Sequence, residues 1–180
     1  MANNFPLATD STFNPSSDMT IQRLVDGVSL AAAQQPTGTG EANEIQMEFG
    51  VAQNTALDPV QLLTDGSLII NQTGTYRVKV SVIFGRLGNG GVAKLRFGAF
   101  INGVQAGLSV GGDVPNQNSE NPYADEAWLT LPAGLTIRYM LIRDSSGAND
   151  GGIFQPTITA ATAPSWNPTA CAAIRVERWV

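Results

Sequence analysis

The chain has 180 residues and a formal net charge of −5, and only 14% of its residues are charged. This length is typical of one domain, and ten Lys and Arg are too few for the basic surface that a nucleic-acid-binding protein concentrates. No run of about 18 apolar residues is present, so the sequence predicts no membrane span. The N-terminus lacks the charged and then apolar pattern of a secretory signal, and we expect synthesis in a cytoplasm.

The inventory of reactive side chains argues against catalysis. The sequence has no histidine, which removes the commonest general base and every imidazole metal ligand. The glycine-rich stretches GNGG and NDGG lack the lysine of a phosphate-binding loop. The single cysteine, Cys171, falls in an alternating segment, where an inert buried thiol is expected. We therefore predict no enzyme, no cofactor and no metal, although calcium accepts oxygen ligands of the kind that Asp144, Asn149 and Asp150 carry.

Residues 1–40 are interpreted as an extended N-terminal arm, and residues 41–180 as the domain. The first 18 residues are rich in Asn, Ser, Thr and Pro, with three isolated apolar side chains, Phe5, Leu7 and Phe13. Alone, such a segment cannot bury enough apolar surface to offset its ordering entropy. We expect it to lie on a neighbouring subunit, on another protein or on its own domain.

The second half of the arm is ambiguous between helix and strand. Over residues 19–33 the apolar side chains have helical spacing, and Asp18 is placed to cap a first turn. Gly27 disfavours a long helix, and VSLAA equally suits the start of a strand. A short helix over 19–33 and an extended segment both remain as interpretations.

Most of the domain reads as antiparallel strands. In residues 75–84, TYRVKVSVIF, apolar and polar side chains alternate, which places the apolar ones on one buried face: Tyr76, Val78, Val80, Val82 and Phe84. The same alternation marks residues 44–51, 94–102, 127–131, 137–141 and 170–180. Asn102-Gly103 suits a tight turn, and Pro156 limits residues 154–162 to an edge strand.

Two stretches are weakly patterned. Residues 109–126 contain many turn formers and read either as a long loop or as a poorly patterned strand. Residues 145–152, SSGANDGG, read as a loop.

Four segments, in this order, resemble a known family: LIINQTGTYRVKV, LRFGAFINGV, LTLPAGLTIRY and AAIRVERWV. They are similar to phrases of the tumour-necrosis-factor and complement-globular-head superfamily, with Gly74-x-Tyr76 and Leu129-x-Leu131-x-x-Gly134 as the most specific matches. The family usually has Asp where Leu135 stands, and its last strand usually lacks charges, whereas this one carries Arg175, Glu177 and Arg178. The resemblance covers residues 42–180 and implies an all-β, antiparallel jelly-roll sandwich.

Members of this superfamily form tight trimers, so the resemblance implies a homotrimer. Five apolar residues fall on the nominally polar faces of their strands, where a subunit interface needs them: Ile83, Phe100, Met140, Ile142 and Trp179. The other interpretation places them beneath loops or beneath the arm.

Tailed bacteriophages use this trimeric jelly roll in capsid decoration, or cement, proteins and in knobs on tails and fibres. We expect a decoration protein on the capsid surface of a virion, with the major capsid protein as partner and with Phe5, Leu7 and Phe13 as capsid-binding anchors. The alternative is a tail or fibre head that binds a receptor or glycan through loops 109–126 and 145–152, with Trp166, Trp128 and Tyr123 as stacking residues. Only about forty residues without heptads precede the domain, which favours decoration over a stalk-borne head.

Overall fold

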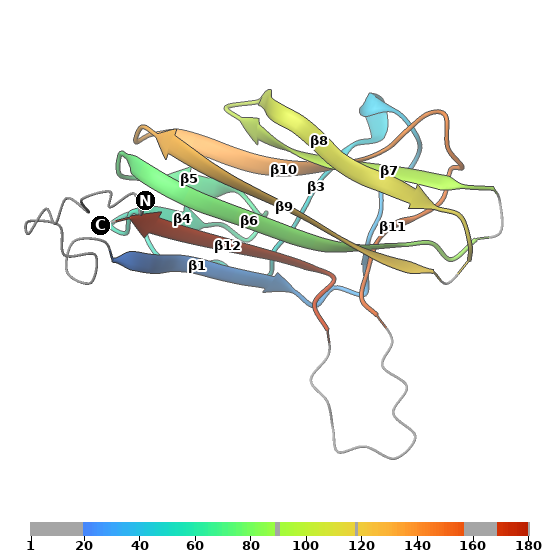
Figure 1. Ribbon diagram of the computed structural model, residues 1–180, viewed down its shortest axis with the longest axis horizontal. Helices are drawn as coiled ribbons and strands as arrows, with labels where there is room; N and C mark the ends of the chain where they lie inside the picture. Colours follow the sequence, from blue (N-terminus) through green and yellow to red (C-terminus); the bar gives the residue numbers. More distant parts are fainter. Residues whose placement is uncertain (1–19, 89–90, 118, 157–168, 180) are drawn as a thin grey trace, which may run out of the picture.

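The computed structural model describes residues 20–88, 91–117, 119–156 and 169–179. They form two antiparallel sheets packed face to face (Figure 1). Within these ranges the one helical element is a 3-10 turn, η1 (Glu41–Asn43).

Sheet A is built around the long strand β6. Its members are β1 (Ile21–Ser29), β2 (Ala33–Gln34), β6 (Gly74–Gly85), β9 (Glu120–Leu131), β11 (Gly152–Phe154) and β12 (Ala172–Trp179). β9 pairs with β6 along its whole length on one edge, while β12 and β11 follow one another along the other edge. β1 pairs with β12 and β2 pairs with β11, which completes the sheet.

Sheet B is built around β10. Its members are β3 (Ile45–Gln46), β4 (Val60–Leu62), β5 (Leu68–Ile70), β7 (Ala93–Ile101), β8 (Val104–Val114) and β10 (Leu135–Arg143), in the order β4-β5-β10-β7-β8 with β3 also on β10. From β5 onward the chain passes between the sheets: β6 in A, β7 and β8 in B, β9 in A, β10 in B, β11 and β12 in A. Two antiparallel sheets connected in this way form a jelly roll, so the predicted all-β jelly-roll sandwich is confirmed.

The core lies between the two sheets and is made by the alternating positions. All five predicted inward residues of β6 are at most 2% exposed: Tyr76, Val78, Val80, Val82 and Phe84. Phe84 meets Phe97 of the opposite sheet edge to face, with ring centroids 6.0 Å apart, a geometry that aromatic pairs favour. Cys171 is buried in the same core as a free thiol.

The helix interpretation of residues 19–33 is wrong for the described part of that segment, because Ile21–Ser29 form β1. The same finding moves the start of the domain from residue 41 to about residue 21, since β1 and β2 are parts of sheet A. Gly27, which disfavoured a helix, has a packing role: a Cβ there would lie 2.6 Å from Leu62 Cδ2 and 2.8 Å from the carbonyl oxygen of Phe49. The pairing with β12, which lies far away in sequence, decides the conformation of this segment.

Residues 109–126 form strands with a short connector. β8 and β9 occupy all but residues 115–119 of that stretch, so the strand interpretation is right and the loop interpretation is wrong. β8 is the end strand of sheet B and β9 the end strand of sheet A. Within the described residues, each of these two strands pairs with another strand on one side only. An end strand needs fewer apolar residues than a central strand, so its alternating pattern is weaker in the sequence.

The Gly74-x-Tyr76 signature accommodates a side chain of the last strand. A Cβ on Gly74 would lie 2.7 Å from Arg178 Nε. The Arg178 guanidinium donates to Gln72 Oε1 at 2.8 Å and to the Thr73 carbonyl at 3.0 Å, and its carbon lies 5.7 Å from the Tyr76 ring centroid. The Arg178 side chain therefore lies over Gly74, where any larger residue would displace it.

Candidate functional site

Two tryptophans form an exposed pair on the outer face of sheet A. Trp128 of β9 and Trp179 of β12 lie on either side of β6, with ring centroids 5.2 Å apart and planes at 73°. Trp128 is 45% exposed and Trp179 is 37% exposed. Ile21 of β1, the residue that pairs with Trp179, is 50% exposed. Trp128, Trp179 and Ile21, together with Arg77 between them, are called the tryptophan face below.

Arg77 of β6 ties the tryptophan face together. Its guanidinium donates two hydrogen bonds of 2.9 Å to the Glu126 carboxylate and one of 3.2 Å to Glu177. These hydrogen bonds, chiefly those that Glu126 accepts, raise the pKa of Arg77 above its ordinary value. The guanidinium carbon also lies 5.6 Å from the Trp128 ring centroid, within cation–π range. Fork-shaped ion pairs of this kind fix side chains that are otherwise mobile.

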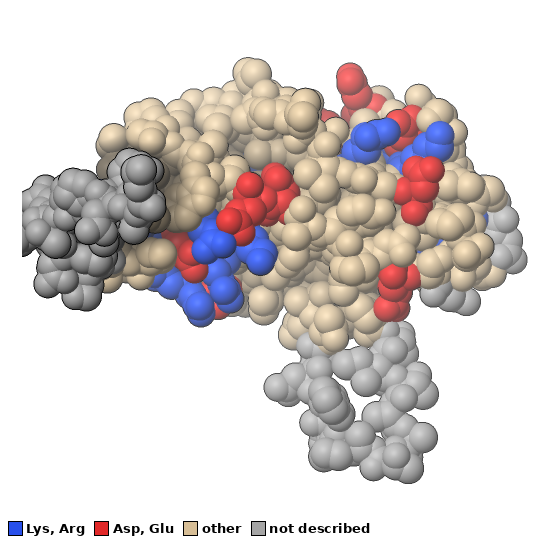
Figure 2. All heavy atoms as spheres, in the orientation of Figure 1, with Lys and Arg blue, Asp and Glu red and all other residues tan. Residues whose placement is uncertain are grey.

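A mixed charged cluster continues from the tryptophan face across sheet A. Arg175 of β12 pairs with Asp26 of β1 at 3.4 Å, and Asp26 also accepts from Arg23 at 3.2 Å. Figure 2 shows these blue and red side chains gathered over the strands of sheet A. Because positive and negative groups alternate there, the face carries no single sign of charge.

The five predicted interface residues lie on two opposite faces. Ile83 and Trp179 are on the outer face of sheet A, and Phe100, Met140 and Ile142 are on the outer face of sheet B. Trp179 is exposed and the other four are partly buried. The structure brings the three residues of sheet B together in one groove, but it does not bring all five into one patch.

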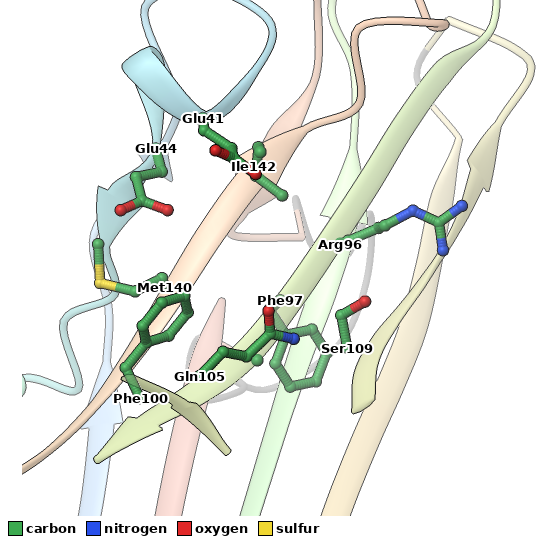
Figure 3. A pocket seen from close by; sticks show the side chains of 10 residues that line it. Glu41, Glu44, Arg96, Phe97, Phe100, Gln105, Ser109, Met140 and Ile142 are labelled. Carbon is green, nitrogen blue, oxygen red and sulfur yellow. The ribbon is translucent and has the colours of Figure 1, made fainter. Parts of the chain in front are cut away.

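The groove on sheet B has a volume of about 290 Å³. Besides Phe100, Met140 and Ile142 it is lined by Glu41, Glu44, Arg96, Phe97, Gly98, Gln105 and Ser109. η1 and the residue after it form one wall, and β8 forms the other (Figure 3). This set of residues is called the sheet B groove below.

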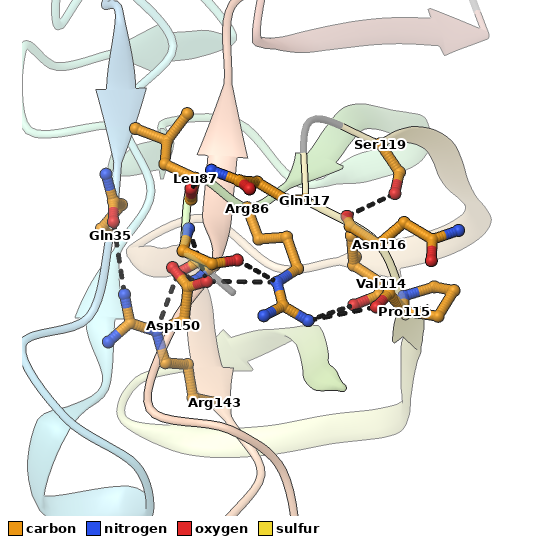
Figure 4. A network of polar contacts seen from close by, with 12 residues as sticks. Gln35, Arg86, Leu87, Val114, Pro115, Asn116, Gln117, Ser119, Arg143 and Asp150 are labelled. Atoms are coloured by element: carbon orange, nitrogen blue, oxygen red, sulfur yellow. Dashed lines mark hydrogen bonds and ion pairs between the residues drawn. The ribbon is translucent and has the colours of Figure 1, made fainter. Parts of the chain in front are cut away.

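A buried polar network closes the end of the sandwich where β6 ends (Figure 4). The Arg86 side chain, 1% exposed, donates to Asp150 Oδ2 at 3.1 Å and to the carbonyls of Gly88, Val114 and Pro115 at 3.0–3.4 Å. Arg143 donates to the Gly151 carbonyl at 2.8 Å and to Asn149 Oδ1 at 3.2 Å, and burial lowers its pKa. Both guanidinium groups are occupied by structural contacts.

The oxygen ligands considered for calcium are occupied by other partners. Asp150 accepts from Arg86 and from the backbone N–H groups of Gly88 and Gly151, Asn149 accepts from Arg143, and Asp144 accepts from Arg96 and Ser146. Among the described residues no three His, Cys, Asp or Glu side chains are grouped so that they could hold a metal ion.

The three residues predicted to stack on a glycan or receptor, Tyr123, Trp128 and Trp166, do not form one site among the described residues. Tyr123 is partly buried: its ring centroid lies 4.8 Å from that of Phe84, and the ring packs against the core. Trp128 is exposed, but on the strand face described above and not in a loop. Trp166 lies outside the described residues.

Sequence reasoning missed Trp128 as the partner of Trp179, and it missed the two glutamates of the sheet B groove. The alternation in β9 does indicate that Trp128 points outward, because Leu129 and Leu131 take the inward positions. Glu41 and Glu44 gave no signal, because only the folding of η1 against β10 places them above Met140.

The predicted capsid-binding residues Phe5, Leu7 and Phe13 lie outside the described residues, and the structure does not test them. In the part of the chain that is described, no helix has the length and apolar character needed to cross a membrane.

Neither a protein-family model nor a curated protein sequence matches the chain. Among solved structures, a tumour necrosis factor, Eiger, from S. frugiperda is similar with 13% identity and a TM-score of 0.44, over 87% of this chain and 93% of that one. The globular domain of a zebrafish complement 1qA protein is similar with 14% identity and a TM-score of 0.35, over 86% and 93%. The jelly-roll fold itself rests on the strand order and register given above.

Proposed function

We propose that this chain is a structural virion protein of a tailed bacteriophage, a decoration or cement protein that binds the outer capsid surface as a homotrimer and stabilises the capsid. The observation that carries the proposal is the tryptophan face. Trp and Arg dominate the energetics of protein interfaces, and here two partly exposed Trp rings and an ion-paired Arg meet on the outer face of sheet A.

Association between copies is the use of the tryptophan face that we favour. A threefold ring needs two different complementary surfaces on each subunit, and Trp179 and Ile83 supply apolar side chains on one of them. Phe100, Met140 and Ile142 remain predicted interface residues, but on the opposite sheet they cannot belong to the same surface as Trp179.

Capsid binding is assigned in this proposal to the segment that precedes β1. Residues 1–18 carry Phe5, Leu7 and Phe13, apolar side chains of the kind that anchor a segment in pockets of a partner. Three such segments on one trimer would act together, so weak individual contacts would sum to firm attachment.

Mixing the purified protein with undecorated capsids tests the proposal. We expect co-sedimentation by the full chain, and loss of it when residues 1–18 are deleted. A matched control replaces only Phe5, Leu7 and Phe13 by Ser, which keeps the length of the segment and removes the anchors. Circular dichroism should give the same β spectrum for all three proteins.

Two outcomes would contradict the proposal. Binding that survives both variants would move the contact from the arm to the sandwich. Failure of the full chain to bind capsids, together with binding to a host glycan or receptor, would identify a tail or fibre head instead.

A further inference from the structure

The sheet B groove exists because the backbone leaves space on the outer face of β7 and β10. Gly98 of β7 faces Met140 of β10 and offers no side chain. Beside it the register of β8 shifts: Phe97 pairs with Val110 but Ala99 pairs with Ala106, so extra residues of β8 arch past Gly98. Bulges of this kind bend a strand and recur beside binding sites.

The floor of the groove is apolar and its wall is acidic. Phe100 and Met140 lie next to one another at its base (Figure 3). The carboxylates of Glu41 and Glu44 have no hydrogen-bond or ion-pair partner among the described residues, and both residues are exposed. In Figure 3 the guanidinium of Arg96 points away from the two glutamates. It pairs with Asp144 at 3.3 Å, so its charge is already matched.

We propose that the sheet B groove binds a lysine or arginine side chain of a partner protein. Such a side chain has a long apolar stem and a charged head, which match the Phe100–Met140 floor and the two unmatched carboxylates. A cation close to the Phe100 ring would gain further stabilisation. The volume of about 290 Å³ is at or below the low end for small-molecule pockets, roughly 300 Å³, which suits one side chain better than a cofactor.

This inference goes beyond the proposed function and replaces its placement of Phe100, Met140 and Ile142 in the interface between copies, because a groove covered by a second copy could not receive the basic side chain of another partner. The chain has a net charge of −5, and the wall of the groove carries two carboxylates. A basic side chain of the partner would supply the positive charge that balances them. A second copy could reach the groove only with one of its own ten Lys and Arg, and the test below separates that case.

Methionine methyl signals provide the test, because Met140 lines the groove whereas Met47 is buried in the core and serves as an internal reference. The full chain, labelled with ¹³C at the methionine methyls, is titrated with N-acetyl-lysine methylamide and, separately, with the uncharged N-acetyl-norleucine methylamide. We expect the Met140 signal to shift saturably with the lysine probe, with a Kd on the order of millimolar for a single side chain. The norleucine probe should bind about tenfold more weakly, and Met47 should not move.

Two variants test separately the negative charge of Glu44 and the free volume of the sheet B groove. Glu44→Gln should weaken the lysine probe about tenfold, whereas Glu48→Gln, the same change on an exposed residue outside the groove, should leave binding unchanged. Gly98→Leu should abolish binding by filling the groove. A Cβ at Gly98 has no neighbour nearer than 3.6 Å, so the chain accommodates it, and an unshifted Met47 signal would confirm the fold.

Three results would overturn the inference. Equal affinity for the lysine and norleucine probes would make the groove a general apolar site. An unmoved Met140 signal at probe concentrations on the order of 50 mM would mean that it is no site. Dissociation of an oligomer by Glu44→Gln, seen by light scattering, would make the groove a contact between copies of this chain.

Discussion

At the scale of single residues, we expect Arg86 to contribute most to the stability of the fold. Its guanidinium is buried and donates to the Asp150 carboxylate, to the carbonyls of the adjacent residues Val114 and Pro115, and to the carbonyl of Gly88. Removing one member of such a group leaves the others buried and unpaired, which costs more than the group contributed in place.

Replacing Arg86 by Met should therefore lower the free energy of unfolding by about 3 kcal/mol or more. The matched control is Arg96→Met, which breaks an ion pair whose arginine is 50% exposed and should cost less than about 1 kcal/mol. Urea unfolding monitored by tryptophan fluorescence measures both variants. Equal costs for the two would show that the buried network adds nothing beyond a surface pair.

Asp144 gives the molecule a response to acid. The backbone N–H and hydroxyl of Ser146, followed by Arg96, lower the pKa of Asp144 from 3.8 to about 2. A carboxyl whose folded-state pKa is lowered stabilises the fold at pH values above its unfolded pKa, and this contribution is lost as the pH falls through the folded value.

We expect stability to decline between about pH 4 and pH 2, and we expect Asp144→Asn to show a shallower decline over that range. Unfolding midpoints of the two proteins, measured from pH 7 to pH 2, provide the comparison. Parallel curves would mean that Asp144 is not the group responsible.

At the scale of elements, the central strands could be predicted and the outer ones could not. β6 and β10 have neighbours on both sides and a dry inner face, so strict alternation is required of them and appears in the sequence. The sequence of β1 leaves a helix and an extended segment both possible, because Leu24 and Val25 are adjacent apolar residues. A register shift between Arg23 and Val25 explains them: the bulge interrupts the period of two that the prediction relies on.

The candidate surfaces could be predicted only in part, for the same reason. The alternation within a single strand indicates that apolar residues such as Trp179 and Met140 point outward. Which of them share a face depends on strand order, and residues 100 and 179 prove to lie on different sheets. The glutamates of the sheet B groove depend on a 3-10 turn, which leaves no periodic pattern.

The tryptophan face yields a prediction about β9 and β12. Trp128→Glu should place a second carboxylate beside Glu126 and remove the ring beneath Arg77, so that self-association weakens by about tenfold or more. Leu57→Glu, on a residue that is 91% exposed and outside both surfaces, is the control for added charge. Sedimentation velocity at several concentrations measures the change. Unaltered association would remove the tryptophan face from the interface.

At the scale of the whole molecule, the prediction concerns assembly. Light scattering should give three times the chain mass of 18.9 kDa. If folding and assembly are coupled, the melting temperature should also rise with protein concentration, because subunits stabilise one another by mass action. A mass of one chain, with a melting temperature independent of concentration, would contradict the trimer.

The register of β1 against β12 determines how the molecule responds to force. Ile21 lies opposite Trp179, so the chain enters and leaves the sandwich at one end (Figure 1). Hydrogen bonds between antiparallel strands run perpendicular to the strands, so a pull that separates residue 20 from residue 179 opens them one after another, like a zipper. A pull on residue 20 against a grip on β12 at Ala172, which lies opposite Ser29, instead shears all of these bonds together. A tether through the N-terminal segment therefore holds best when the load is taken at the far end of the sandwich.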